Sequence, residues 1–206
     1  MTKRRIVIVA AIVAIVALIA AGTGAFFTAE THVTNVITTG TINIDVLEYT
    51  RDENGNLIDW PEGGISGVVP GRGVAKLVSL KSEDGSGDAW VRILVENSVI
   101  AADGETALPV DGLLSFDIQD GWFLADDGYY YYSRPLSGGE TTPELFTTVS
   151  FSGDMDKDYA SCTVNVVVSA QAVQKKNNDN NGTLTALTAD NYSQVLGWPS
   201  VTEGGD

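Results

Sequence analysis

Beyond Gly40, hydrophobic and polar residues alternate with a period of two along most of the chain, and helical periodicity is nearly absent. This alternation is typical of β-strands that bury one face and expose the other. Clusters of glycine, asparagine and aspartate separate the alternating runs and mark turns. The clearest runs cover residues 42–47, 73–81, 90–96, 114–119, 147–151 and 161–173. Short strands at this spacing predict an all-β sandwich or barrel.

An aromatic stretch in the middle of the chain predicts a hairpin. Residues 126–128 (Asp-Asp-Gly) form a turn signal that folds residues 122–124 back onto residues 129–132. Period two places Tyr129 and Tyr131 on one face of this strand and the two other tyrosines on the opposite face. We expect one pair in the core and the other on the outer face, where it either packs across strands or forms an aromatic binding patch.

The longest predicted strand covers residues 161–173, where six small or apolar residues share one face. Cys162 belongs to this face and is therefore expected to point inward as an inert, buried thiol. After this strand the sequence predicts a polar loop over residues 175–182. Residues 188–196 are expected to form a short helix with Thr188 as its N-cap.

The N-terminus has the pattern of an export signal. A basic start at residues 3–5 is followed by an unbroken apolar run, Ile6 to Ala21, and then by small residues. Thr23 and Ala25 are the small residues that a signal peptidase inspects, so we expect cleavage after Ala25 and a mature chain that begins at Phe26. The alternative is an uncleaved membrane anchor, because the apolar segment is long enough to span a bilayer.

The charge of the chain narrows the possible partners. Lysine and arginine total 12 and aspartate and glutamate total 27, a formal charge of −15. Loss of residues 1–25 leaves 9 basic and 27 acidic side chains, or −18 over 181 residues. Nucleic-acid binding is not expected, because it needs clustered basic residues. Export and acidity together suit a secreted, soluble extracellular protein. Its subunits would repel one another, and salt or divalent cations would relieve that repulsion.

Histidine and cysteine are too scarce for most metal and nucleophile chemistry. The chain has one of each, His32 and Cys162. This excludes a disulfide framework, nearly all structural zinc sites and, unless His32 takes part, histidine-assisted nucleophilic catalysis. No position matches a catalytic motif, so we assign no catalytic residue and do not expect an enzyme.

Calcium is the more plausible metal, although no cofactor is required by the sequence. Asp154, Asp156 and Asp158 offer closely spaced oxygen ligands, as does the stretch 52–56. Neither stretch has the glycine and glutamate that an EF-hand loop needs at its sixth and twelfth positions. A solvated acidic turn is the simpler interpretation of both.

Cleavage after Ala25 would leave residues 26–39 as an N-terminal arm with few charges and many β-branched residues. One parity of this arm carries Phe27, Ala29, Thr31 and Val33, after Phe26 at its start. Such an arm can add to an exposed sheet edge through main-chain hydrogen bonds. It either pairs with a neighbouring molecule or folds back as the first strand of its own sandwich.

Several stretches of the chain, in order, carry a family resemblance. Residues 24–28 (Gly-Ala-Phe-Phe-Thr) are followed by residues 35–42 (Asn-Val-Ile-Thr-Thr-Gly-Thr-Ile). Later stretches that fit are 69–76 with 89–92, 127–136 with 145–146, and the strand 164–174. Together, and behind this signal, they make the chain resemble the TasA/camelysin (CalY) family of secreted Gram-positive proteins.

The resemblance implies a jelly-roll-like antiparallel β-sandwich over residues 40–206, preceded by the signal helix (1–25) and the arm (26–39). It implies that a dedicated signal peptidase, SipW, reads the signal, and that only an uncleaved signal would hold the chain in a membrane. It further implies a structural subunit of biofilm-matrix fibres. In the TasA case the N-terminal segment of one subunit completes the sheet of the next, so the expected partners are copies of this chain or a related fibre subunit.

Two other functions stay open at the level of sequence. A monomeric secreted or surface-held binding module would use the aromatic face and would keep residues 26–39 as an intrachain strand. Camelysin-type members have also been described as metallopeptidases. A zinc peptidase of the usual kind needs several nitrogen ligands, and His32 alone does not supply them.

Overall fold

A computed structural model of the chain describes residues 27–30, 35–38, 42–62, 64–176, 178–179 and 183–199. The signal segment and the expected cleavage site at Thr23, Ala25 and Phe26 lie outside the described residues. Over the described ranges, none of the helical turns has the length and apolar composition needed to cross a bilayer.

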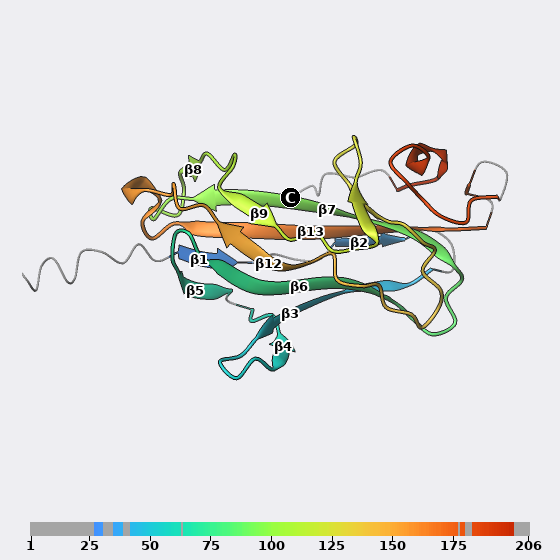
Figure 1. The fold of residues 1–206 in the computed structure, drawn as a ribbon, viewed down its shortest axis with the longest axis horizontal. Helices are drawn as coiled ribbons and strands as arrows, with labels where there is room; N and C mark the ends of the chain where they lie inside the picture. Colours follow the sequence, from blue (N-terminus) through green and yellow to red (C-terminus); the bar gives the residue numbers. More distant parts are fainter. Residues whose placement is uncertain are drawn as a thin grey trace, which may run out of the picture.

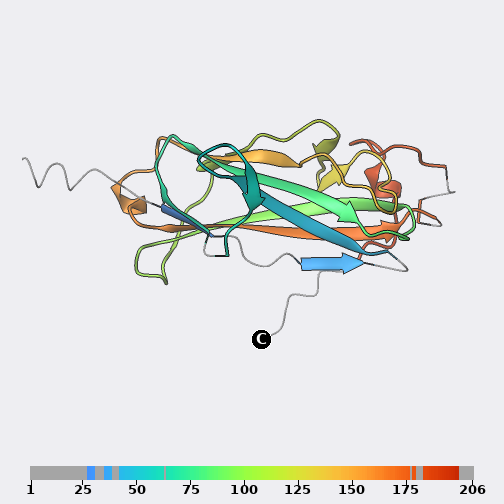
Figure 2. The same cartoon turned by 90° about the horizontal axis from the view of Figure 1, so that it is seen from below.

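The described strands form two sheets packed face to face, which confirms the all-β sandwich (Figures 1 and 2). The larger sheet has the order β10 (Trp122–Leu124), β11 (Tyr130–Tyr132), β7 (Ala89–Ile100), β13 (Thr163–Gln174), β1 (Phe27–Glu30) and β5 (Ile65–Val68), with β2 (Asn35–Thr38) also paired to β13 and β8 (Ala107–Leu108) to β7. The smaller sheet has the order β4 (Leu57–Asp59), β3 (Ile44–Arg51), β6 (Gly73–Ser82), β12 (Phe146–Phe151) and β9 (Leu114–Phe116). The pairing is antiparallel except where β1 and β2 run parallel to β13.

The larger sheet is organised around β7 and β13, which lie side by side along the long axis of the molecule (Figure 1). They pair without interruption from Thr163 opposite Ile100 to Gln174 opposite Ala89. Alternate residues of β13 are buried against the smaller sheet, as its period of two predicts. Cys162 lies just before this strand, is 1 % exposed, and joins the same core, so the prediction of an inward thiol is confirmed. Burial raises the pKa of this thiol to about 11, which keeps it protonated at neutral pH.

The core between the sheets is made of aliphatic and aromatic side chains from both layers. Val78 and Leu80 come from β6, Phe146 from β12, and Val91 and Ile93 from β7, and all are fully buried. Burial of each such side chain stabilises the fold by roughly 1.5–3 kcal/mol. The alternating hydrophobic residues of the sequence therefore stabilise the fold by packing in this core.

The aromatic hairpin forms as the sequence predicts. Trp122 pairs with Tyr132 across β10 and β11, and the turn between them closes with a hydrogen bond from the Ala125 N–H to the Tyr129 carbonyl. Gly128 has a φ of 84°, a conformation that favours glycine. Tyr132 joins the main core, whereas Tyr131 is buried on the opposite face of the sheet.

The prediction of a short helix over residues 188–196 is wrong. Only Tyr192–Gln194 forms a helical turn, of the 3-10 type, and its N-cap is Asn191 rather than Thr188. The segment leaves helical geometry because Val195 forms a β-bridge with Asp179, and because the next N–H, from Leu196, donates to the Asn178 carbonyl. Tertiary pairing thus overrides the local helical preference.

Asp117 compensates for an irregularity in the smaller sheet. β12 changes register against β6 between Phe146 and Thr148, and its pairing with β9 ends at Phe116. The Asp117 Oδ1 atom accepts from the N–H groups of Thr147 (2.8 Å) and Thr148 (2.6 Å), and Oδ2 accepts from the Thr147 hydroxyl. Partial burial raises the pKa of Asp117, but the hydrogen bonds from these two threonines outweigh it and hold the pKa below its ordinary value.

We expect Asp117→Ala to lower the free energy of unfolding by about 0.5–1.5 kcal/mol, because water replaces the lost acceptor at this largely exposed position. Denaturant unfolding monitored by tryptophan fluorescence measures the change. Asp111→Ala is the control, because Asp111 is exposed and makes none of these contacts. Equal effects of the two substitutions would contradict the role given to Asp117.

The same carboxylate should make stability depend on pH. Because its folded-state pKa lies below the ordinary value of 3.8, its contribution is complete above that value and is lost as the pH falls through the folded-state pKa. The stability difference between the wild-type chain and Asp117→Ala should therefore be constant from pH 7 to 5 and shrink below pH 4. A difference that does not change down to pH 2.5 would show that these hydrogen bonds do not depend on the ionised form.

Candidate functional site

The first arm segment occupies a slot inside the larger sheet. β1 lies between β13 and β5, so both of its edges are paired. It runs parallel to β13, with Ala29 opposite Val164, and antiparallel to β5, with Ala29 opposite Ile65. A strand paired on both sides uses its main-chain N–H and C=O groups in both directions. β1 is therefore an interior strand of the sheet and not an edge strand.

The second arm segment pairs with the same strand farther along. β2 runs parallel to β13 from Asn35 opposite Ser169 to Thr38 opposite Ala172. Since β7 pairs with β13 along its whole length, β1 and β2 share the opposite edge of β13. Figures 1 and 2 show β1 toward one end of the molecule and β2 toward the other, near the red C-terminal residues. Two stretches of the same edge of β13, Thr163–Asn165 and Ser169–Ala172, thus pair with the two described arm segments.

The residues predicted to form the arm are only in part described. Phe27 and Ala29 belong to β1, whereas Phe26, Thr31 and Val33 lie outside the described residues. His32 also lies outside them. Both described arm segments pair within the same chain, which is the arrangement that a self-inserted arm predicts. Donation of the arm to a neighbouring molecule stays a prediction.

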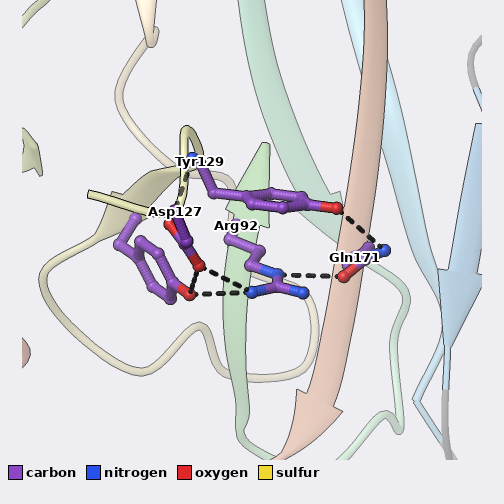
Figure 3. Close-up of polar contacts among 5 residues, drawn as sticks. Arg92, Asp127, Tyr129 and Gln171 are labelled. Atoms are coloured by element: carbon purple, nitrogen blue, oxygen red, sulfur yellow. Dashed lines mark hydrogen bonds and ion pairs between the residues drawn. The ribbon is translucent and has the colours of Figure 1, made fainter. Parts of the chain in front are cut away.

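A buried arginine organises the outer face of the larger sheet (Figure 3). Arg92, on β7, is 8 % exposed. Its Nε donates to the Gln171 Oε1 atom at 2.9 Å, and one terminal nitrogen reaches the Asp127 Oδ2 atom (3.1 Å) and the Tyr131 hydroxyl (2.8 Å). The Tyr131 hydroxyl in turn donates to Asp127 at 2.7 Å. The guanidinium therefore joins β7 to β13 and to the turn of the aromatic hairpin.

Aromatic rings complete the surroundings of this cation. The guanidinium carbon lies 3.8 Å from the Tyr129 ring centroid and 4.4 Å from that of Trp198. Cation–π contacts of this kind strengthen when they are shielded from water. Burial raises the pKa of Tyr131 well above its ordinary value, and its hydrogen bond to Asp127 acts in the same direction. The hydroxyl therefore remains a donor to Asp127 over the whole physiological range.

Residues 183–199, here called the C-terminal strap, cover this face. Leu187 and Val195 of the strap are buried against Trp90 of β7, Tyr131 of β11 and Val173 of β13. The tyrosine face that sequence reasoning offered as a binding patch is therefore packed beneath the strap. Of the two interpretations, packing is the one that the structure supports for Tyr131.

Arg92 was not identified as a site residue from the sequence. Its outward parity was visible, because Trp90, Arg92 and Leu94 alternate with the inward Val91 and Ile93. The ring that reaches it from the strap, Trp198, is distant in sequence and carries no local signal. The available clue was a charged residue placed between Trp90 and Leu94 on the outward face.

A second buried cation lies inside the sandwich. Lys76, on β6, is 1 % exposed, bonds the Glu48 carboxylate at 3.1 Å and lies 4.0 Å from the Trp60 ring centroid. Burial lowers the pKa of Lys76, and the attraction of Glu48 opposes that shift. This trio shows the same combination of cation, carboxylate and ring as the Arg92 cluster.

The acidic turn offered for calcium makes local contacts. Asp156 accepts from the Asp158 N–H at 2.9 Å as the N-cap of the 3-10 turn Lys157–Tyr159, and Asp158 lies 3.6 Å from the Lys157 ammonium. Asp154 contacts the Ser152 hydroxyl. Within the described residues, no three histidine, cysteine or carboxylate side chains are grouped so that they could hold a metal ion.

Comparisons with protein-family models, curated proteins and solved structures found no match to this chain.

We expect Arg92→Ala to lower the free energy of unfolding by about 2–4 kcal/mol, because it removes charged hydrogen bonds and two ring contacts at once. Arg92→Lys should give a smaller loss, since an ammonium keeps the charge but not the planar fork that reaches Gln171 and Tyr131 together. Denaturant unfolding measures both. Arg72→Ala, at an exposed arginine, is the matched control and should change stability by less than about 0.5 kcal/mol. If Arg92→Ala behaved like the control, the cluster would not contribute to folding.

Proposed function

We propose that the chain is a secreted structural subunit of extracellular biofilm-matrix fibres. In a fibre, residues 26–39 of one molecule would fill the edge of β13 in the next. The observation that carries the proposal is the slot between β13 and β5, which the structure fills with an N-terminal segment paired on both sides. The resemblance to the TasA/camelysin family supports the same assembly. The expected partners are copies of this chain or a related subunit.

The slot can be filled from the same chain or from a neighbour with the same main-chain contacts. Each hydrogen bond contributes a net of about 0.5–1.5 kcal/mol in either case. The balance between the two arrangements is then set by the linker after β2 and by protein concentration, as in domain swapping. Self-insertion in a dilute single molecule is therefore compatible with donation in a concentrated matrix.

Charge sets the conditions for assembly. The expected mature chain carries −18, so neighbouring molecules repel one another over roughly 10 Å at 0.1 M salt. The arm carries few charges, which lets it cross that repulsive gap at low electrostatic cost. Assembly should therefore increase with ionic strength.

Electron microscopy of two mature chains, one beginning at Phe26 and one at Gly40, tests this function. We expect fibres from the first at high protein concentration and 0.5 M salt, and none from the second. Monomers from both chains, with the longer one more heat-stable, would mean that the arm only completes its own sheet. The proposed function would then be wrong.

Ala29→Pro provides a sharper variant. Because β1 is paired on both edges, a proline there removes a ladder donor whichever way the N–H points. We expect loss of fibres in sedimentation and electron microscopy, with the β-sandwich retained in circular dichroism. Ala102→Pro is the control. Ala102 is exposed and follows Ala101 in a turn closed by the Gly104 N–H, a position that tolerates proline. Fibre formation by Ala29→Pro would contradict pairing through β1.

A further inference from the structure

Arg92, Gln171 and β2 lie in one row across three neighbouring strands. Arg92 of β7 is the register partner of Gln171 of β13, and Gln171 is the register partner of Ile37 of β2. β1, in contrast, pairs with Thr163–Asn165 at the far end of β13. The Arg92 cluster is therefore adjacent to one half of the acceptor edge and remote from the other.

The side chain of Gln171 is fixed at both ends of its amide. Its Oε1 accepts from Arg92 Nε at 2.9 Å, and its Nε2 lies 3.5 Å from the Tyr129 hydroxyl. The residue is only 3 % exposed. Because the side chain is held, the β13 backbone at this point is held too. A strand that pairs with a rigid edge loses less conformational freedom overall than one that must also order its acceptor.

The strap is what shields this contact. Trp198 stacks on the Arg92 guanidinium, while the Leu187 N–H donates to the Ser133 carbonyl at 2.8 Å and the Leu196 N–H to the Asn178 carbonyl. These anchors hold the strap at both of its ends. Exclusion of water strengthens the Arg92–Gln171 hydrogen bond beneath it. Figures 1 and 2 place the red strap at the same end of the molecule as β2.

We infer that the C-terminal strap is a working part of the acceptor for the arm, with Trp198 and Arg92 as positioning residues that order β13 where β2 pairs. The inference deepens the proposed function, since it identifies what controls occupancy of the acceptor edge. It also holds for an arm that pairs within its own chain. The strap therefore helps to keep β2 paired with β13. It has no such effect on β1, which pairs at the far end of β13.

Amide hydrogen exchange on the mature chain, resolved residue by residue by NMR, tests the coupling. We expect Trp198→Ala to accelerate exchange in residues 35–38 by about tenfold or more and to leave residues 27–30 within about twofold of the wild type. Trp198→Phe should restore most of the protection, because it keeps a ring over Arg92. Arg92→Lys should behave like Trp198→Ala.

Asp117→Ala is the matched control for a general loss of stability, because Asp117 follows β9 and accepts hydrogen bonds from β12 of the smaller sheet, away from the arm. It should accelerate both arm segments by the same factor. If Trp198→Ala accelerates both segments equally, or neither, the strap is only a stabiliser and the inference is overturned. Selective loss at residues 35–38 in a chain that forms no fibres would reject the proposed function and leave this inference standing.

Discussion

The uninterrupted pairing of β7 with β13 is the constraint on which the rest of the structure depends. One face of this pair supplies the larger sheet's share of the core, including Val91 and Val164. The other face carries Trp90, Arg92 and Gln171 beneath the strap. The outer edge of β13 is left for the arm. Core, outer cluster and acceptor edge are thus three surfaces of one two-stranded ribbon.

The two buried cations show how a strongly acidic chain uses its few basic residues. Arg92 and Lys76 each combine a carboxylate partner with an aromatic ring. Burial of an unpaired charge would be prohibitive, and either neighbour alone compensates only in part. Each cation also fixes elements that are far apart in sequence. In these two residues, positive charge links parts of the molecule that are far apart in the sequence.

Features that depend on residues close together in the sequence could be predicted, and features that depend on distant residues could not. Period two identified the longest strand, the inward thiol of Cys162 and the two-faced aromatic hairpin, because these depend on neighbours within a few residues. The 3-10 turn at Tyr192–Gln194 was missed because a β-bridge to Asp179 decides it. The parallel course of β1 and β2 along β13 was also missed. Local alternation shows that a segment is a strand but not which strand it joins, or in which direction.

The Arg92 cluster illustrates the same limit for the candidate site. Tyr129 and Tyr131 were identified as residues of interest, and their facing was predicted correctly. Their partner from the strap, Trp198, is brought in by tertiary folding alone. The three acidic residues proposed as calcium ligands were visible as a sequence cluster, yet hydrogen bonding to nearby main-chain and side-chain groups separates their roles.

The parallel orientation of the arm along β13 has a consequence for any filament built through it. Donor and acceptor are different surfaces of the molecule, so the contact is heterologous and each subunit repeats the direction of the last. Such a filament is polar. One terminus would present a vacant groove between β13 and β5, and the other a free N-terminal strand. The two tips would differ chemically, and a capping or anchoring protein could distinguish them by shape alone.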